Sequence, residues 1–402
     1  MSARQRWFSV FILALAFALR VIALDLRPAH FDEGVNGSFL DGMRTEGCYR
    51  YDPANYHGPL HFYTLFAGQQ LFGRSLWVLR MPTALIGTAL VALMLAFHRF
   101  LPWRAVWIAA IAAAISPAMV FYSRYAIHEM WLPFFTLLAV YGGCGIVRRD
   151  GRIGDLWAFG IGLAGMVLTK ETYFIHWIAA VLALVAMRFL EWLTPLAPRV
   201  QRARPADLFA GRPADTADAV PRTAYFTNRQ IATVTLTCIA AVLVFQSGFG
   251  LYPDGIRGLF ETFRLMFAKG TTAEAGHNKE FFYWVKLMAW YEWPALLGLI
   301  AAPLLSLRRS NVAATLVLIV AALLIAIGCF GDAIGIHTGA AKDFLKPDLR
   351  LASLPSLSLW LVACSVGFLA ASPAQSRELR WLCLYGLASF AAYSLIPYKT
   401  PW

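Results

Sequence analysis

Residues 30–34 read His-Phe-Asp-Glu-Gly and follow directly after the first long apolar run of the chain, Trp7 to Leu26. If that run spans a bilayer, the adjacent acids Asp32 and Glu33 lie where the chain leaves the lipid. Charged groups at such a depth are costly unless they are paired or used, so the pair is a candidate functional feature. We therefore ask which other polar groups share its side of the membrane.

The composition is that of a polytopic membrane protein. The chain has 402 residues, of which 59% are hydrophobic and 14% charged. Its apolar runs have helix length, and a bilayer core of about 30 Å needs about 20 apolar residues per helix. We predict an all-α polytopic membrane protein with about 11 transmembrane helices, at 7–26, 76–97, 104–122, 130–147, 154–169, 172–192, 230–250, 293–307, 312–330, 351–371 and 380–396.

The positive charge is explained by membrane topology rather than by nucleic acid. The net charge is +12, and most of the excess is arginine in short loops. Positively charged short loops face the cytoplasm, so a cytoplasmic amino terminus puts the segments 27–75 and 251–291 outside. Cys48 alone among the six cysteines lies in a polar segment, so no disulfide framework is predicted. The first run lacks an Ala-x-Ala cleavage pattern and is read as a retained span rather than a signal peptide.

The chain divides into three parts. Residues 1–192 form a first membrane half with the first outer loop, 27–75. Residues 193–229, rich in proline and arginine, are expected to be a flexible cytoplasmic linker. Residues 230–402 form a second membrane half with the outer loop 251–291. Within 27–75, the segments from Gly34 to Glu46 and from Pro59 to Phe72 carry apolar residues near helical spacing, which predicts two helices in the membrane interface.

Two alternatives stand for each acid of the first pair. Asp32 either caps a helix that begins near Glu33, or is a carboxylate placed to accept a proton. A reciprocal capping box would need Glu or Gln at Val35, so capping alone is an incomplete account. Glu33 is either a second acid or a solvated charge in the first helical turn.

Further polar groups collect in the outer segments. His57 and His61 are four residues apart at the start of the second interfacial helix, but two histidines are weak support for a metal. Arg124 either pairs with Glu129 or grips a phosphate while Glu129 joins the acidic site. The tight turn Thr169-Lys170-Glu171 contains an ion pair that a simple turn does not require. The remaining candidates are Tyr56, His128, Tyr398 and Lys399.

Together these residues resemble the glycosyltransferase C superfamily. The carriers are the Asp-Glu pair in a long first outer loop, Tyr56-x-x-Pro59, Arg124-x-x-x-x-Glu129 and the Thr-Lys-Glu turn. The pattern is most similar to the branch of protein O-mannosyltransferases and lipid A aminoarabinose transferases, and within it to the flippase-activity-associated proteins of archaeal-type N-glycosylation. Members of this family often continue past a Tyr-Lys-Thr-Pro-Trp segment, so the sequence is expected to be truncated or a short member.

The resemblance implies a function. Such enzymes transfer a sugar from a polyprenyl-phosphate carrier to a lipid, protein or glycan on the outer face of a bacterial or archaeal cell membrane. Carried over, the catalytic carboxylate is Asp32, with Glu33 beside it and Glu129 as the second acid. Tyr56, His57, His61, Arg124, His128, Lys170, Glu171, Tyr398 and Lys399 would contact substrate. The oligosaccharyl branch suggests Mg²⁺ or Mn²⁺ on Asp32 and Glu129, which a monophosphate donor with cations nearby makes dispensable.

Two other functional classes are weighed against a transferase. A lipid-linked sugar transporter would place ionisable groups at mid-bilayer, whereas the charges here collect at the ends of the predicted runs, with Arg20, Arg80 and His176 further inside. A non-catalytic or flippase-associated component of a glycosylation pathway would keep the fold but tolerate the loss of Asp32. No protease motif of the His-Glu-x-x-His or Gly-x-Ser-x-Gly type is present.

Overall fold

The fold is described from a computed structural model of the chain. The structure describes residues 2–53, 57–148, 151–193, 226–271 and 377–395, with a few isolated positions between 283 and 323. The contacts separate two compact units, which are described one at a time. Unit 1 contains 1–174 and 209–268, and unit 2 contains 175–208 and 269–402.

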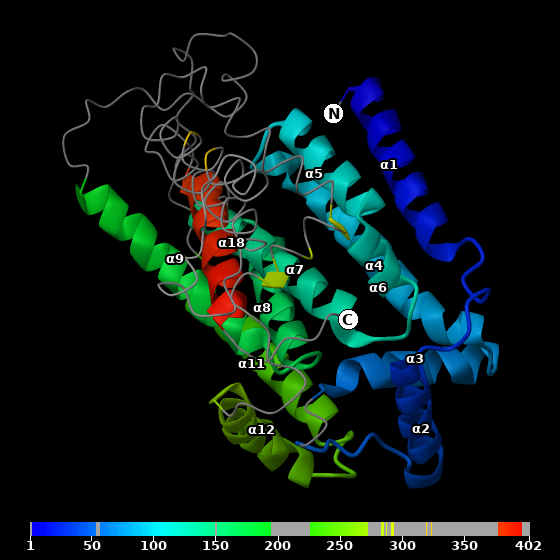
Figure 1. The fold of residues 1–402 in the computed structure, drawn as a ribbon. Helices are drawn as coiled ribbons and strands as arrows, with labels where there is room; N and C mark the ends of the chain where they lie inside the picture. The colour runs from blue at the N-terminus through cyan, green and yellow to red at the C-terminus, as the bar shows by residue number, and fades with distance from the viewer. Residues whose placement is uncertain are drawn as a thin grey trace, which may run out of the picture. The chain divides into compact units, whose positions relative to one another are not determined.

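Unit 1 is a bundle of apolar helices. α1 (Ala3–Val21) packs on α4 (Leu76–Ala96) and on α5 (Trp103–Ile115) (Figure 1). α7 (Trp131–Arg148) packs on α4 and along the length of α8 (Ile153–Val167). α8 in turn contacts α11 (Asn228–Gln246). Short 3₁₀ turns, η1 (Phe97–Arg99) and η2 (His128–Met130), extend α4 and precede α7. Within the described residues, three helices are long and apolar enough to cross a membrane, or four if the bent α5–α6 pair is one span.

The α7–α8 contact depends on glycine. A Cβ added to Gly142 would lie 2.3 Å from the backbone nitrogen of Phe159, and one added to Gly162 would lie 2.4 Å from that of Ala139. Because lipid offers no hydrophobic drive for association, membrane helices adhere where small residues let their backbones come close. Gly142 and Gly162 therefore allow α7 and α8 to pack with their backbones in close contact.

The predicted span 104–122 is not one helix, which corrects the sequence prediction. α5 ends at Ile115 and α6 (Pro117–Ser123) continues after Ser116 at an angle of 58°. Pro117 has no N–H for the helical ladder and its ring crowds the preceding turn, so the helix breaks there.

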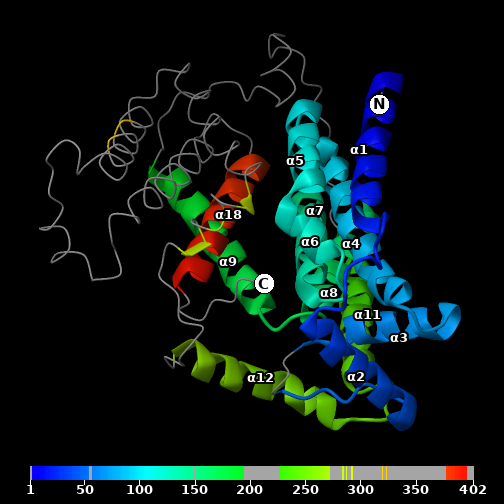
Figure 2. The same ribbon diagram turned by 45° about the vertical axis from the view of Figure 1, so that its right-hand side comes forward.

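The two predicted helices of the first outer loop are confirmed. α2 (Phe31–Glu46) and α3 (Pro59–Phe72) pack through a cluster that includes Leu40, Phe62 and Leu65, each fully buried. α12 (Asp254–Thr271) comes from the second predicted outer loop. In both views α2, α3 and α12 lie at the same end of the helices α4, α7 and α11, as the predicted topology requires (Figure 1, Figure 2).

Unit 2 is described through α9 (Tyr173–Leu193), from Ile175 onward, and α18 (Arg377–Leu395). His176 joins these helices, since its Nδ1 lies 2.8 Å from the hydroxyl of Tyr385 and its Nε2 lies 3.2 Å from that of Tyr393. The predicted spans 293–307, 312–330 and 351–371 and nearly all of the predicted linker 193–229 lie outside the described residues.

Candidate functional site

The start of α2 fixes how the acidic pair is presented. The helix begins at Phe31 and its N-cap is His30, whose Nδ1 accepts a hydrogen bond from the Asp32 backbone N–H at 3.2 Å. The Glu33 side chain accepts from the His30 N–H at 2.8 Å, so the pair forms a capping box. The alternative in which Asp32 caps the helix is therefore wrong, because the cap falls two residues earlier.

Glu33 is bound to Arg80 inside the protein. Arg80 donates Nε to Glu33 Oε1 at 2.8 Å and Nη2 to Glu33 Oε2 at 2.7 Å. The same carboxylate also accepts the backbone N–H of Ala126 at 2.8 Å, besides that of His30. Glu33 and Arg80 are 2% and 1% exposed. The remaining Arg80 donors reach the carbonyls of Leu24, Arg27 and Pro28.

This arrangement makes Glu33 an anchor rather than a free acid. Four N–H donors occupy its two oxygens, and a buried bidentate pair of this kind fixes geometry strongly. It ties α2 to α4 and, through Ala126, to the turn between α6 and η2. Sequence reasoning missed this role of Arg80, although an arginine alone inside an apolar run was a signal for it.

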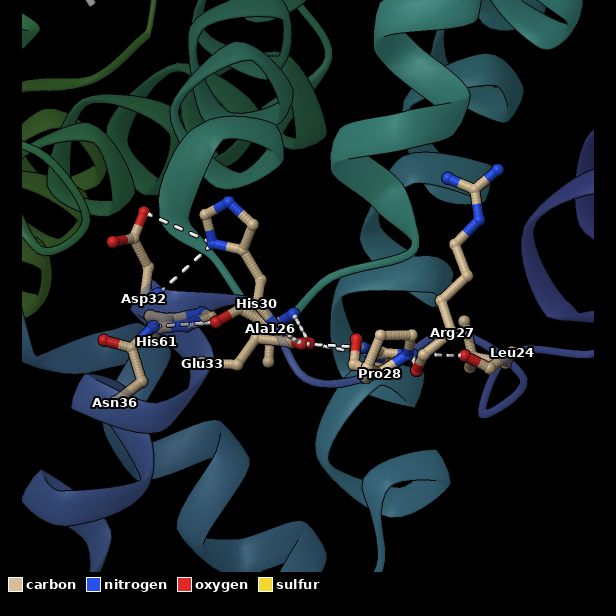
Figure 3. Close-up of polar contacts among 10 residues, drawn as sticks. Leu24, Arg27, Pro28, His30, Asp32, Glu33, Asn36, His61 and Ala126 are labelled. Atoms are coloured by element: carbon tan, nitrogen blue, oxygen red, sulfur yellow. Dashed lines mark hydrogen bonds and ion pairs between the residues drawn. The ribbon is translucent and has the colours of Figure 1, made fainter.

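Asp32 lies next to this anchor but faces elsewhere. Its side chain is 41% exposed, and its Oδ2 lies 3.7 Å from Nδ1 of His30. Figure 3 shows the Asp32 carboxylate beside the His30 ring, while Glu33 lies on the side of Ala126. Of the predicted acidic pair, Asp32 is thus the carboxylate that a substrate can reach.

Arg124 does not pair with Glu129, which corrects one of the two alternatives. Its guanidinium donates to the carbonyls of Leu19, Ile22 and Ala23 at 3.0, 2.8 and 2.7 Å. These carbonyls close the carboxyl end of α1, where helical acceptors lack partners and a cation is favoured. Arg124 thus attaches the turn after α6 to the segment that leads to Asp32.

Glu129 pairs instead with Lys170, whose Nζ donates to Glu129 Oε1 at 3.1 Å. His57 Nδ1 lies 3.3 Å from Oε2 of Glu171, the residue after Lys170. The predicted turns around 124–129 and 169–171 therefore meet the first outer loop in one cluster, although their sequence positions are far apart.

A backbone bridge holds the first outer loop in this cluster. His57 and Lys170 form an antiparallel bridge, with Gly58 N–H donating to the Thr169 carbonyl at 3.1 Å and Leu60 N–H to that of Leu168 at 3.0 Å. A Cβ on Gly58 would lie 2.2 Å from the Leu168 carbonyl group. Only glycine fits this approach.

Three imidazole rings lie against one another behind the bridge, with His57 stacked on His128 and His61 tilted against it. The His128 ring centroid lies 4.2 Å from that of His57 and 4.1 Å from that of His61. His61 and His128 are buried, and burial lowers the pKa of His61 to about 3, so its ring is neutral. Within the described residues no group of three or more His, Cys, Asp or Glu side chains has the arrangement of a metal site.

A small hollow opens beside Glu171. It is lined by Tyr51, Glu171, Tyr173 and Thr262 with apolar neighbours, and has an empty volume of about 260 Å³, part of it open to solvent. The Tyr51 and Thr262 hydroxyls are 2.6 Å apart, and burial raises the pKa of Tyr51 to about 12. Neither Tyr51 nor Thr262 was among the predicted site residues.

Ala126 joins the two parts of the site. Its N–H binds Glu33, and its carbonyl accepts from Asn36 Nδ2 at 2.7 Å and lies 3.4 Å from His61 Nε2. The anchored start of α2 and the histidine cluster are therefore built on one turn. Of the predicted site residues, Tyr56, Tyr398 and Lys399 lie outside the described part of the chain.

Comparison with known proteins places this geometry in a familiar fold. Residues 56–197 match the family described as dolichyl-phosphate-mannose-protein mannosyltransferase. A comparison with curated proteins finds no match.

Among solved structures, the chain is similar to ArnT from Cupriavidus metallidurans bound to undecaprenyl phosphate, at 17% identity and a TM-score of 0.51, covering 96% of this chain and 77% of ArnT. The apo state of the same protein gives a TM-score of 0.52, at 17% identity over 98% of this chain and 78% of ArnT. The S. cerevisiae Pmt1–Pmt2 complex bound to the sugar donor gives 0.41, at 17% identity over 65% of this chain and 34% of that one.

Proposed function

We propose that this chain is a multi-pass membrane enzyme of the glycosyltransferase C superfamily, which transfers a sugar from a polyprenyl-phosphate donor to an acceptor on the outer face of a bacterial or archaeal cell membrane. The observation that carries the proposal is the partly exposed Asp32 beside the buried Glu33–Arg80 pair. The two ArnT structures that share this fold come from one protein, and one of them holds undecaprenyl phosphate.

In this proposal Asp32 is the catalytic carboxylate. It accepts the proton of the acceptor hydroxyl as the oxygen attacks the anomeric carbon of the donor in line, which inverts the configuration there. The bond to the donor phosphate breaks, and the electron pair leaves on a phosphate that is already anionic, so no general acid is required. Glu33 is left out of the chemistry, since all its contacts are with the protein.

Cations of the same region would meet the phosphate. Arg124 is only partly buried and uses three of its N–H donors on the end of α1, whereas a guanidinium has five. Lys170 is 22% exposed beside Glu129 and can exchange that partner for a phosphate oxygen. With these cations Mg²⁺ or Mn²⁺ is dispensable, and added EDTA should leave transfer unchanged.

The decisive experiment is transfer from a radiolabelled undecaprenyl-phosphate sugar by the purified protein. Asp32→Asn should lower the rate at least about 100-fold, the contribution of a general base, with an unchanged melting temperature. Asp25→Asn is the matched control, an exposed acid seven residues earlier. Undiminished transfer by Asp32→Asn rejects the catalytic assignment. Native mass spectrometry of the wild type would identify the sugar on a co-purifying isoprenoid phosphate.

A further inference from the structure

Arg20 is buried among four helices without an acidic partner. It lies in α1 and is 0% exposed. Within the described residues no carboxylate forms an ion pair with it, and its donors go instead to oxygens of the backbone and of one serine. A charge in a membrane span is costly and is retained where it has a task, so this contact set calls for an explanation.

Two of these oxygens belong to the broken end of α5. Arg20 Nη1 donates to the Ala114 carbonyl at 3.1 Å and Nη2 to the Ala113 carbonyl at 3.0 Å. Both carbonyls lie in the last turn of α5, where acceptors have no donor within the helix. Residue 117, whose N–H would ordinarily bind Ala113, is proline and has none. Arg20 therefore supplies the hydrogen bonds that the break removes.

A third contact reaches the far end of α6. Arg20 Nε donates to Ser123 Oγ at 3.1 Å, and Ser123 is the last residue of that helix. α4 leaves room for this contact at Gly87, where a Cβ would lie 2.1 Å from Ser123 Oγ and 3.0 Å from Arg20 Nε. One guanidinium thus joins both sides of the 58° bend.

The residues directly after Ser123 build the candidate site. Arg124 closes the end of α1, and the Ala126 N–H binds Glu33 in the anchor next to Asp32. Glu129 follows in η2 and pairs with Lys170. A change in the angle between α5 and α6 would therefore move all three groups relative to Asp32.

We propose that Arg20 is a positioning residue, which fixes the bend of the broken span and thereby sets the turn 124–129 against Asp32. This inference rests on the proposed function, because it gives the turn a part in transfer. Arg20 itself touches no substrate in this account, but the turn that it positions carries Arg124, which the proposed function places on the donor phosphate. Its loss should therefore lower kcat and also raise KM for the donor.

The test compares Arg20→Met, Pro117→Ala and the double variant in one detergent. Arg20→Met should lower both the melting temperature and kcat, because the carbonyls of Ala113 and Ala114 lose their donors. In Arg20→Met with Pro117→Ala, residue 117 regains an N–H and the helix can continue, so the melting temperature should recover. The rate should stay at least about tenfold below that of the wild type, because a straight span displaces the turn. Arg6→Met, an exposed arginine of the same helix, is the control.

Hydrogen exchange of the peptide covering 124–128 gives a readout that does not depend on activity. We expect faster exchange there in Arg20→Met and in the double variant, with α7 and α8 still protected. Recovery of both stability and transfer in the double variant would overturn the inference, because Arg20 would then serve stability alone. Unchanged exchange at 124–128 would also overturn it.

A second variant keeps the test decisive if Arg20→Met does not fold. Arg20→Lys keeps the charge but cannot reach Ser123 and both carbonyls, so it should show the same faster exchange with a milder loss of rate. A fully active Arg20→Lys with wild-type exchange would contradict the proposal. If the wild type shows no transfer while exchange at 124–128 responds as expected, the proposed function fails and the structural role of Arg20 stands.

Discussion

The Glu33 carboxylate receives Nε and Nη2 of Arg80 at 2.8 and 2.7 Å, in an ion pair that is almost wholly removed from solvent. The pair links the first residues after α1, the start of α2 and the middle of the outer turn through Ala126. The pair fixes the position of Glu33 and thereby that of the neighbouring Asp32. Its value lies in geometry, since a buried ion pair gains little net stability over apolar packing.

Breaking this pair from one side should be severe. Arg80→Met leaves the Glu33 charge buried without its partner, which typically costs about 3–5 kcal/mol of unfolding free energy. Arg74→Met is the control, because Arg74 pairs with Asp41 at the surface and such pairs contribute about 0–1 kcal/mol. Thermal unfolding in detergent measures both. Equal melting temperatures for the two variants would show that the buried pair is not an anchor.

A substitution at Gly58 should disrupt the backbone bridge between the first outer loop and the turn after α8. Gly58→Ala should lower stability and transfer together, because its Cβ would meet the Leu168 carbonyl at 2.2 Å and neither backbone can yield without losing the bridge. Gly42→Ala in α2 is the control, since nothing lies within 4 Å of its added Cβ and alanine favours a helix by about 0.5–1 kcal/mol. A Gly58→Ala protein as stable and active as the wild type would contradict the close approach.

Glu129 and Lys170 should behave as a unit. Lys170→Met and Glu129→Gln each remove one end of the same 3.1 Å contact. In a double-mutant cycle their effects on stability should fall short of additivity by about 0.5–3 kcal/mol, as neighbours in contact do. Additive effects would mean that the pair is not formed in the folded protein in detergent.

Burial of His61 predicts a pH dependence of stability. The folded protein holds its pKa near 3, below the ordinary value of 6.5, so between these values the unfolded chain binds a proton that the folded one does not. Stability should therefore fall as the pH drops below about 6.5, by up to about 1.4 kcal/mol per pH unit, and be flat above it. His61→Gln should reduce this slope in urea titrations at pH 5 and 7 without abolishing it, because burial also lowers the pKa of the neighbouring His128 and gives a slope of the same sign. A slope as steep in His61→Gln as in the wild type would assign it to other groups.

The sequence predicted the two helices of the first outer loop and the apolar helices of the described residues, because apolar periodicity and helix ends are local signals. It also indicated which turns lie together, since arginine placement predicts which loops share one side of the membrane. The sequence could not predict which groups these charged side chains bind. Whether Arg124 met Glu129 or the end of α1 depended on the break at Pro117, and the choice of Lys170 for Glu129 depended on a backbone bridge between distant segments. Arg80 was visible as a lone charge in a span, but its partner was decided only by packing.

The bridge that starts at His57 has a consequence for biosynthesis. His57 and Glu171 are 114 residues apart in the sequence. The loop that carries His57 is therefore synthesised well before Glu171, and several apolar helices are inserted in between. During that interval the segment that carries His57 lacks its partner in the backbone bridge. Assembly of the candidate site is therefore a late event of insertion, and a chain arrested before Thr169 would have its first helices in place without a complete site.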